Sequence, residues 1–254
     1  MPSYSISQAH LSIEELTRLY QKAKDSLQIT NPYDLDLIFQ VAIEDTDRFP
    51  TISIKEGTDP KYYLVRWITN YIDARNNLPS KREAHLKSAC TDPAIRVIVQ
   101  NAQQLSEEET IKGEAQHNLF MSAENIQGNL LEEFLAQQIR PYGFLWCIGN
   151  TLHAIDFCNS TGKCLLQIKN KSNTENSSSS KIRTGTSITK WYRLGTRTQK
   201  GIKIPRYNWE QINALISDNR TEGFQLPPLN ITEKNYLHFL QQVSVVNKKI
   251  ITDQ

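Results

Sequence analysis

The hydrophobic pattern of this 254-residue chain changes its period once, near Phe144, and this change separates a helical part from a strand-rich part. Before Phe144, apolar residues recur at spacings of three and four, which places them on one face of a helix. The segments expected to be helices are residues 11–27, 34–44, 60–72, 80–89 and 92–104. We therefore expect a mainly helical N-terminal region over residues 1–120.

The segment before Phe144 predicts two further helices. Ser106 has the position of an N-cap, because three glutamates follow it in the first turn. A second helix is expected to begin at Ser122 or Asn125 and to end at Ile139. Its apolar stripe has Glu132 on one side and Glu133 on the other. Pro141 and Gly143, which follow, are residues that end helices.

After Phe144, short apolar runs alternate with turn residues, which indicates a meander of three strands. The expected strands are residues 144–148, 151–158 and 164–170, with a further strand at residues 187–192 and helices at residues 209–217 and 233–245. The fold class predicted from this pattern is α/β, with a mixed central β-sheet flanked by helices. Residues 121–254 are expected to carry this sheet and to form one compact unit with the N-terminal region.

Composition narrows the class of protein. Apolar residues make up 39% and charged residues 22% of the chain, as in water-soluble globular proteins. No apolar run approaches the roughly 20 residues that cross a bilayer. The N-terminus also lacks the basic and apolar regions of a secretory signal. We therefore expect a cytoplasmic protein without membrane contact.

The four cysteines, Cys90, Cys147, Cys158 and Cys164, are then expected to be reduced thiols. A zinc site of Cys147, His153, Cys158 and Cys164 is the alternative. It is disfavoured because the chain has no C-x2-C pair, that is, no two cysteines with two residues between them, as zinc sites often have.

Positive charge is concentrated in one segment. Residues 161–206 contain eleven basic residues and one acid, Glu175, which gives +10, so the rest of the chain sums to −8 against a total of +2. Aromatic residues such as Trp191 and Tyr192 alternate with these charges. A concentrated basic segment of this kind is typical of a protein that binds a polyanion. The alternative is a solvated basic face without a ligand.

Within that region, three polar side chains are expected to meet at the edge of a hairpin. Asp156 lies in an apolar strand pattern, where an ionised carboxylate is costly unless it is paired or bound to a metal. Gln167 and Lys169 are two residues apart and so share one face of the next strand. Ile168 points to the other face, and its main-chain carbonyl is a candidate metal ligand. An ion pair of Asp156 with Lys163, and a solvated Lys169, are the alternatives.

These residues suit metal-assisted cleavage of a phosphodiester. Magnesium is held in proteins by one or two carboxylates and keeps several of its waters. The reaction requires a positioned water and charge relief on the phosphoryl oxygens. Asp156 and Gln167 are therefore candidate ligands of Mg²⁺. Lys169 is the candidate for orienting the water and stabilising the phosphate.

This pattern resembles the PD-(D/E)XK nuclease superfamily. The matching residues are Gly128, Glu132, Asp156, Gln167 and Lys169. The resemblance implies that Glu132 supplies a further carboxylate from the preceding helix. The adjacent Glu133 is the alternative donor. It also implies that Glu132, Asp156, Gln167 and the carbonyl of Ile168 hold the metal. The chain departs from the pattern at Ile155, where proline is typical, and at Gln167, where a second acid is typical.

The run QIKNKSNTENSSSSKIR followed by KWYR is similar to type II restriction endonucleases of the SinI type, over roughly residues 124–210. This resemblance implies cleavage of double-stranded DNA at a short site by a homodimer, with a cognate DNA methyltransferase in the same restriction-modification system.

The polar loop after Lys169 suits the reading of bases, since Asn pairs with adenine, Arg and Lys with guanine, and Ser with base edges or phosphates. The residues predicted to contact DNA are Lys171, Asn173, Asn176, Ser177, Ser178, Ser179, Lys181, Arg183, Lys190 and Arg193. A flexible linker is the alternative for this loop. A non-catalytic nucleic-acid-binding protein and a DNA-repair nuclease or nickase are the alternatives for the chain as a whole.

Overall fold

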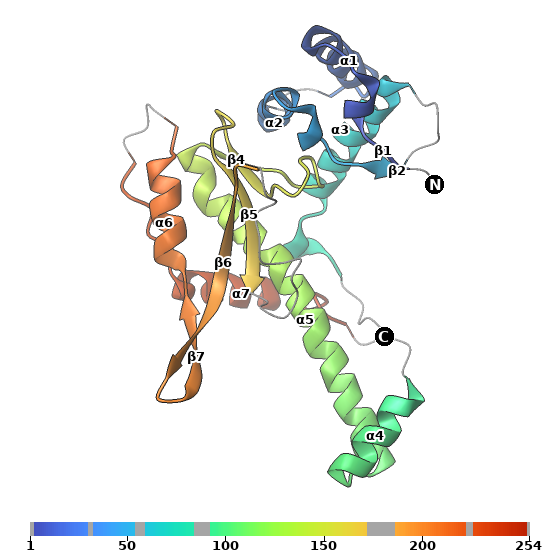
Figure 1. Cartoon of the computed structure of the whole chain (residues 1–254), viewed down its shortest axis with the longest axis vertical. Coiled ribbons are helices and arrows are strands. Elements are labelled where there is room, and N and C mark those ends of the chain that lie inside the picture. Colours follow the sequence, from blue (N-terminus) through green and yellow to red (C-terminus); the bar gives the residue numbers. More distant parts are fainter. Residues whose placement is uncertain are drawn as a thin grey trace.

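The computed structural model describes residues 3–29, 33–53, 59–83, 92–171, 186–221 and 226–252. The chain has a small helical region at one end, a five-stranded sheet with helices beside it, and two arms that project the same way (Figure 1). One arm is made of helices and the other is a β-hairpin. This is the α/β architecture with a mixed sheet that the sequence predicted.

The N-terminal region is helical, as predicted. Its elements are β1 (Ser3–Tyr4), α1 (Ile13–Ser26), α2 (Tyr33–Ile43), β2 (Ile52–Ser53) and α3 (Pro60–Asn76), and β1 pairs with β2. Ser12 begins α1 with a capping box, and Asp59 caps α3 in front of Pro60. Tyr20 stacks on Phe39 with ring centroids 3.9 Å apart, and the buried Trp67 packs edge-on against both rings. Aromatic packing therefore holds α1, α2 and α3 together.

The helix that carries the two glutamates is longer than predicted. Ser106 caps α5 (Glu107–Ile139), which runs for 33 residues without a break at Ser122 or Asn125. The prediction of two helices was wrong because the polar stretch after Ser106 has no apolar periodicity to show that the helix continues. The shorter α4 (Pro93–Gln103) packs against the first half of α5. The predicted division after residue 120 falls inside α5.

Two 3-10 turns, each of which follows a helix, help to connect the N-terminal region to the part of the chain that carries the five-stranded sheet. The turn η3 (Pro79–Lys81) packs on α5, and η4 (Arg140–Tyr142) follows α5 directly. Gly143, at φ +84°, ends η4 in the left-handed region that favours glycine. Trp67 of α3 donates a hydrogen bond from Nε1 to the carbonyl of Thr151 at 2.8 Å. Among the described residues, no helix is long and apolar enough to cross a membrane.

The sheet has the order β3-β4-β5-β6-β7. Its strands are β3 (Phe144–Trp146), β4 (Phe157–Asn159), β5 (Leu165–Lys171), β6 (Ile188–Gln199) and β7 (Ile202–Tyr207). The pair β5 and β6 is parallel and the other pairs are antiparallel, so the sheet is mixed. The meander of β3, β4 and β5 confirms the prediction.

Two details of the sheet differ from the prediction. The strand predicted at residues 151–158 is shorter, and Asp156 lies one residue before β4 instead of in mid-strand, because residues 149–154 form turns with Ala154 at φ +59°. β6 is longer than predicted and continues into β7, which the sequence analysis missed. The turn of this hairpin is Lys200–Gly201, where both residues have positive φ, as in the type I′ turns that join antiparallel strands.

The core beside the sheet is closed by α6 (Trp209–Asp218) and α7 (Glu233–Val246), both close to their predicted bounds. Trp191 of β6 packs on Trp209 of α6. Phe134 of α5 contacts Trp209 and also Tyr236 of α7. These aromatic side chains fix α5, α6 and α7 against the strands and so determine where Glu132 lies.

Candidate active site

Asp156 is held in position by main-chain hydrogen bonds to both neighbouring strands. Its carbonyl accepts from the amide of Cys147 at 2.9 Å, and its amide donates to the carbonyl of Leu166 at 2.8 Å. Its carboxylate also accepts from the amide of Ile168, with Oδ2 2.6 Å from the nitrogen. One carboxylate oxygen is therefore fixed beside β5, and the other, Oδ1, is left for a ligand.

The two glutamates of α5 point to different partners. Glu133 is buried, and it accepts hydrogen bonds from the amide of Ser80 at 2.7 Å and from the hydroxyl of the same residue at 2.5 Å. Its carboxylate thus caps the turn η3. Glu132 instead accepts a hydrogen bond from the indole of Trp146, with Nε1 3.4 Å from Oε2. Its carboxylate is also close enough to Asp156 and Lys169 to feel their charges.

Both site carboxylates are harder to ionise than usual. Burial raises the pKa of Glu132 to about 8, and repulsion by Asp156 adds to the shift, while the hydrogen bond from Trp146 and the charge of Lys169 oppose it. Burial also raises the pKa of Asp156, although the hydrogen bond from Ile168 and the charge of Lys169 lower it. Two carboxylates whose pKa values burial raises, with Lys169 as the positive charge that lowers both, are a candidate site for a cation.

Glu132 and Asp156 line one cavity of about 390 Å³. Trp146 and Arg82 are also in its wall. A larger cleft of about 980 Å³ lies next to it and is lined by Glu133 and Arg140, but neither Glu132 nor Asp156 reaches it. The two candidate carboxylates therefore line the smaller cavity and not the larger cleft.

Gln167 and Lys169 share a face of β5, as predicted. Ile168 between them is buried, and the burial of the strand alternates in the same way. In the parallel ladder, Gln167 lies opposite Lys190 and Lys169 lies opposite Tyr192 of β6. Residues opposite each other in such a ladder point to the same side, so Lys190 and Tyr192 flank Gln167 and Lys169.

Trp146 and Arg82 line the same cavity as Glu132 and Asp156, and neither was predicted from the sequence. Trp146 lies in a strand that reads as core, and its indole N–H gave no signal of a carboxylate partner. Arg82 lies 50 residues before Glu132 in the sequence, and no local pattern connects these two residues. Only the fold brings these side chains to the same cavity.

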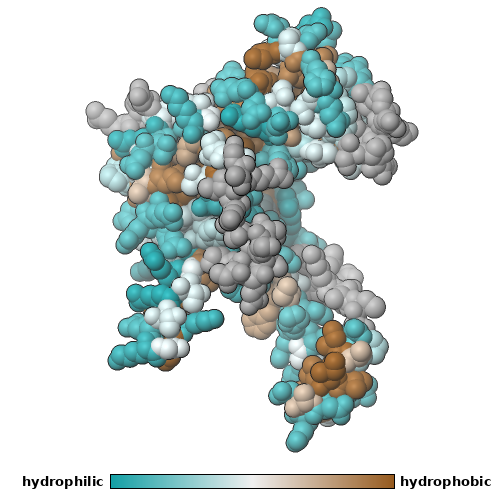
Figure 2. All heavy atoms as spheres, viewed as in Figure 1, coloured by the Kyte–Doolittle hydropathy of each residue, from teal (hydrophilic) through white to brown (hydrophobic). Residues whose placement is uncertain are grey.

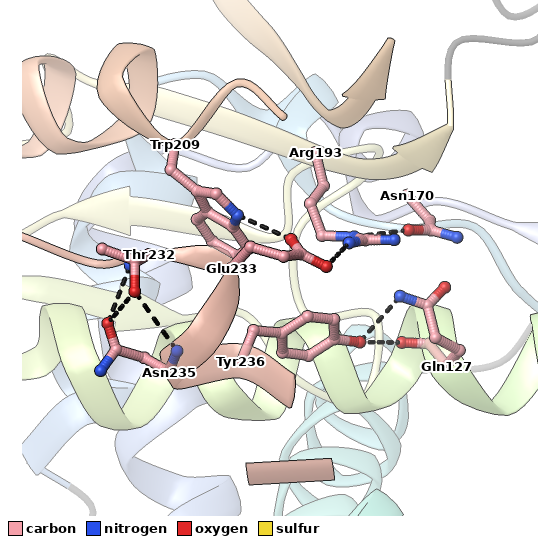
Figure 3. A network of polar contacts seen from close by, with 8 residues as sticks. All are labelled: Gln127, Asn170, Arg193, Trp209, Thr232, Glu233, Asn235 and Tyr236. Carbon is pink, nitrogen blue, oxygen red and sulfur yellow. Dashed lines mark hydrogen bonds and ion pairs between the residues drawn. The ribbon is translucent and has the colours of Figure 1, made fainter. Parts of the chain in front are cut away.

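Arg193 was predicted to contact DNA, and the structure places it inside the protein. Its guanidinium is buried and forms an ion pair with Glu233 of α7, while Nε donates to Asn170 Oδ1 at 2.9 Å (Figure 3). It also lies over the ring of Tyr236 at 5.2 Å. Trp209 donates to the second oxygen of Glu233 at 2.8 Å. The charge of Arg193 is thus used to join β5, β6 and α7.

The other predicted DNA contacts fall into two groups. Lys171 is exposed at the end of β5, 3.5 Å from Glu124, and Lys190 is half-buried beside Gln167. The remaining predicted contacts lie outside the described residues: Asn173, Asn176, Ser177, Ser178, Ser179, Lys181 and Arg183.

The cysteines do not form the alternative zinc site. In the described part of the chain, no three or more His, Cys, Asp or Glu side chains are arranged to hold a metal ion. Cys147, Cys158 and Cys164 are buried free thiols, and the sulfurs of Cys147 and Cys158 are 3.8 Å apart. A metal at the Glu132–Asp156 pair would therefore need uncharged oxygen ligands to complete its shell.

Comparison with known proteins matches most of the chain. The model of the SinI restriction endonuclease family matches residues 42–234. The type II restriction enzyme SinI of Salmonella infantis is 31% identical over 223 residues, which are 84% of this chain and 91% of that protein. The type II restriction enzyme Eco47I of Escherichia coli is 34% identical over 158 residues, 61% of this chain and 62% of that protein.

The fold, the paired carboxylates and these matches define the class of protein as a restriction endonuclease, a site-specific hydrolase that acts in a restriction system. The chain belongs to the SinI restriction endonuclease family. This family favours an enzyme over the non-catalytic binding protein and over the repair nuclease that the sequence left open.

Proposed function

We propose that the chain is a magnesium-dependent type II restriction endonuclease that hydrolyses both strands of DNA as a homodimer, with Glu132, Asp156, Gln167 and Lys169 as its active site. The observation that carries this proposal is the pair of carboxylates in one cavity, with raised pKa values and a single lysine beside them. The enzyme would act in the cytoplasm, beside a cognate DNA methyltransferase that protects the cell's own sites.

The donor set suits Mg²⁺, which takes hard oxygen ligands and keeps several waters. Glu132, Asp156 Oδ1, the amide oxygen of Gln167 and the carbonyl of Ile168 are the proposed ligands. Because Gln167 carries no charge, the second negative charge comes from α5 through Glu132. When bound, the ion would neutralise the carboxylates and polarise the phosphoryl group.

The chain's own residues divide the remaining work. Asp156 is oriented by the amide of Ile168, so its free oxygen points to one place. Trp146 orients Glu132 in the same way, through a weaker hydrogen bond. Lys169 would hold the attacking water and place a positive charge beside the phosphoryl oxygens as negative charge develops there.

The DNA-binding surface is proposed to include Lys171, Lys190 and the polar loop residues named above. The β6–β7 hairpin extends it. Four basic side chains of this hairpin are exposed: Arg197, Lys200, Lys203 and Arg206. A two-stranded ribbon fits the major groove of B-DNA, which carries the most distinctive pattern of base edges. The hairpin is therefore proposed to replace Arg193 as a source of DNA contacts.

Incubation of the purified protein with phage DNA, with and without Mg²⁺, tests the proposed function. Discrete fragments that appear only with Mg²⁺ are expected. Smears or nicks would indicate a nuclease without site specificity, and a gel shift without cleavage would indicate a binding protein. Mapping the fragment ends on a sequenced plasmid would then give the recognition site and the cut position.

A further inference from the structure

The cavity of Glu132 and Asp156 has one basic side chain in its wall. Among the described residues that line this cavity, the charged ones are Glu132, Asp156 and Arg82. Glu132 comes from α5 and Asp156 precedes β4, whereas Arg82 directly follows η3, in the segment between α3 and α4. This segment therefore contributes a cation to a cavity whose two acids come from α5 and from the sheet.

The main chain around Arg82 is held in place by two other helices. Glu133, the neighbour of Glu132 on α5, accepts hydrogen bonds from the amide and the hydroxyl of Ser80. Asn247, which ends α7, donates from Nδ2 to the carbonyl of Ser80 at 3.0 Å and to the carbonyl of Arg82 at 2.9 Å. The backbone of Arg82 is thus fixed relative to α5, and so relative to Glu132.

The guanidinium of Arg82 keeps its charge and its terminal nitrogens available. Its Nε donates to the carbonyl of Asn77 at 2.7 Å, which restricts the orientation of the group. Within the part of the chain that the structure describes, no acid forms an ion pair with Arg82, and its Nη1 and Nη2 make no hydrogen bond. Arg193 differs, because Glu233 neutralises its charge inside the protein. The half-buried Arg82 is therefore suited to bind an anion.

The chemistry of this cavity suits a phosphate. Ionised Glu132 and Asp156 repel a phosphate, so its approach requires positive charge from a bound cation and from the wall. The terminal nitrogens of a guanidinium present parallel N–H groups that match two oxygens of a phosphate group. A cavity of about 390 Å³ has the volume of roughly a dozen water molecules at about 30 Å³ each, which is enough for a phosphodiester group.

We propose that Arg82 binds a phosphate of the DNA backbone at the cavity of Glu132 and Asp156, from the N-terminal side of the site, while Lys169 acts from β5. This inference deepens the proposed function and rests on it for the identity of the anion. The strand β5 points toward the gap between the two arms, and this gap is open in the space-filling view (Figures 1 and 2). A duplex in the gap brings its backbone to the end of β5, and Arg82 then stabilises the negative charge that develops on the phosphoryl oxygens.

Chemical labelling of arginines in the full chain tests this contact without cleavage. The reagent p-hydroxyphenylglyoxal modifies accessible guanidinium groups, and mass spectrometry measures the modification of each arginine. The protein is labelled alone and with phage DNA, in Ca²⁺ in both cases so that the DNA is not cut. Arg18, an exposed arginine of α1, is the internal control. DNA should slow the labelling of Arg82 at least about tenfold, because a hydrogen bond between charged groups reduces the free fraction by that factor. The labelling of Arg18 should not change.

Substitution of Arg82 tests its effect on the reaction. The matched control is Lys81→Ala, because Lys81 is an exposed basic residue of the same turn. Arg82→Ala should lower the single-turnover rate of plasmid cleavage in Mg²⁺ about 100-fold, whereas Lys81→Ala should cut at the wild-type rate. Far-UV circular dichroism checks the fold, and Arg82→Gln replaces the alanine variant if alanine unfolds the turn.

Three results would overturn the assignment: labelling of Arg82 that DNA does not slow, equal protection of Arg18, or cleavage by the Arg82 variant at the rate of Lys81→Ala. A wild type that protects Arg82 but cuts no DNA would contradict only the proposed function, because the labelling requires no cleavage. A wild type that cuts DNA while Arg82 stays unprotected would contradict only the role of Arg82.

Discussion

Replacing Glu132 by glutamine tests whether the two buried carboxylates form a cation site. With a pKa of about 8, Glu132 is protonated in most molecules at pH 7, so binding of a divalent cation must expel that proton. Cation affinity should then fall about tenfold, or about 1.4 kcal/mol, for each pH unit below 8, and it should level off above pH 9. Glu132→Gln removes both the charge and this dependence.

Calorimetric titration with Ca²⁺ in two buffers of different ionisation enthalpy measures the effect, because it counts the protons released. The wild type should release close to one proton per Ca²⁺ at pH 7. Glu132→Gln should bind more weakly and release far less. Equal proton release by the two proteins, or a wild-type affinity that does not change between pH 6 and pH 9, would show that Glu132 does not lose a proton when the cation binds.

The same raised pKa affects the stability of the metal-free protein. In the folded protein the pKa of Glu132 is raised from 4.5 to about 8. Between pH 4.5 and about pH 8 the unfolded chain therefore ionises this carboxyl more readily than the folded protein does, and the folded state loses stability as pH rises through this range. After allowance for solvent screening, Glu132→Gln should stabilise the protein at pH 9 by about 1–3 kcal/mol, or several degrees in Tm. Thermal unfolding in EDTA should show this gain at pH 9 and little gain near pH 4.5.

Three further predictions concern other parts of the molecule. Lys169→Met should reduce cleavage at least about 100-fold in a plasmid assay, while a gel shift in Ca²⁺ stays within a few-fold; retained cleavage would exclude its role. Glu233→Gln should destabilise the chain by about 3–5 kcal/mol in urea unfolding, because it leaves the buried Arg193 unpaired. An unchanged midpoint would contradict that role. Lys203→Ala/Arg206→Ala should reduce the steepness of log DNA affinity against log salt concentration by about 1.8, because each lost phosphate contact accounts for about 0.9. An unchanged slope would show that these two side chains do not contact phosphates.

Most of the helices and the strand that carries Gln167 and Lys169 were predictable from local sequence because their signals are local. Ser12 and Asp59 begin helices where capping chemistry places them, and the turn before Leu165 follows from its glycine and polar residues. Gln167 and Lys169 share a face because strand geometry has a period of two. These features depend on a few consecutive residues.

The features that sequence analysis missed depend on distant partners. The burial of Arg193 comes from Glu233, which lies 40 residues further along, and the positive charge alone suggested DNA instead. β7 was missed because Pro205 and exposed charges hide its alternation. The choice between Glu132 and Glu133 needed the position of Ser80, which binds Glu133 across 53 residues of sequence.

Cleavage of a sequenced plasmid by Asp156→Asn tests whether Asp156 belongs to the active site of a magnesium-dependent endonuclease. Asp218→Asn, an exposed acid of α6, is the matched control. Wild type and control should produce the same discrete fragments with Mg²⁺, and Asp156→Asn should produce none while it still shifts DNA in Ca²⁺. Discrete fragments from Asp156→Asn at the wild-type rate would show that Asp156 is not part of the active site.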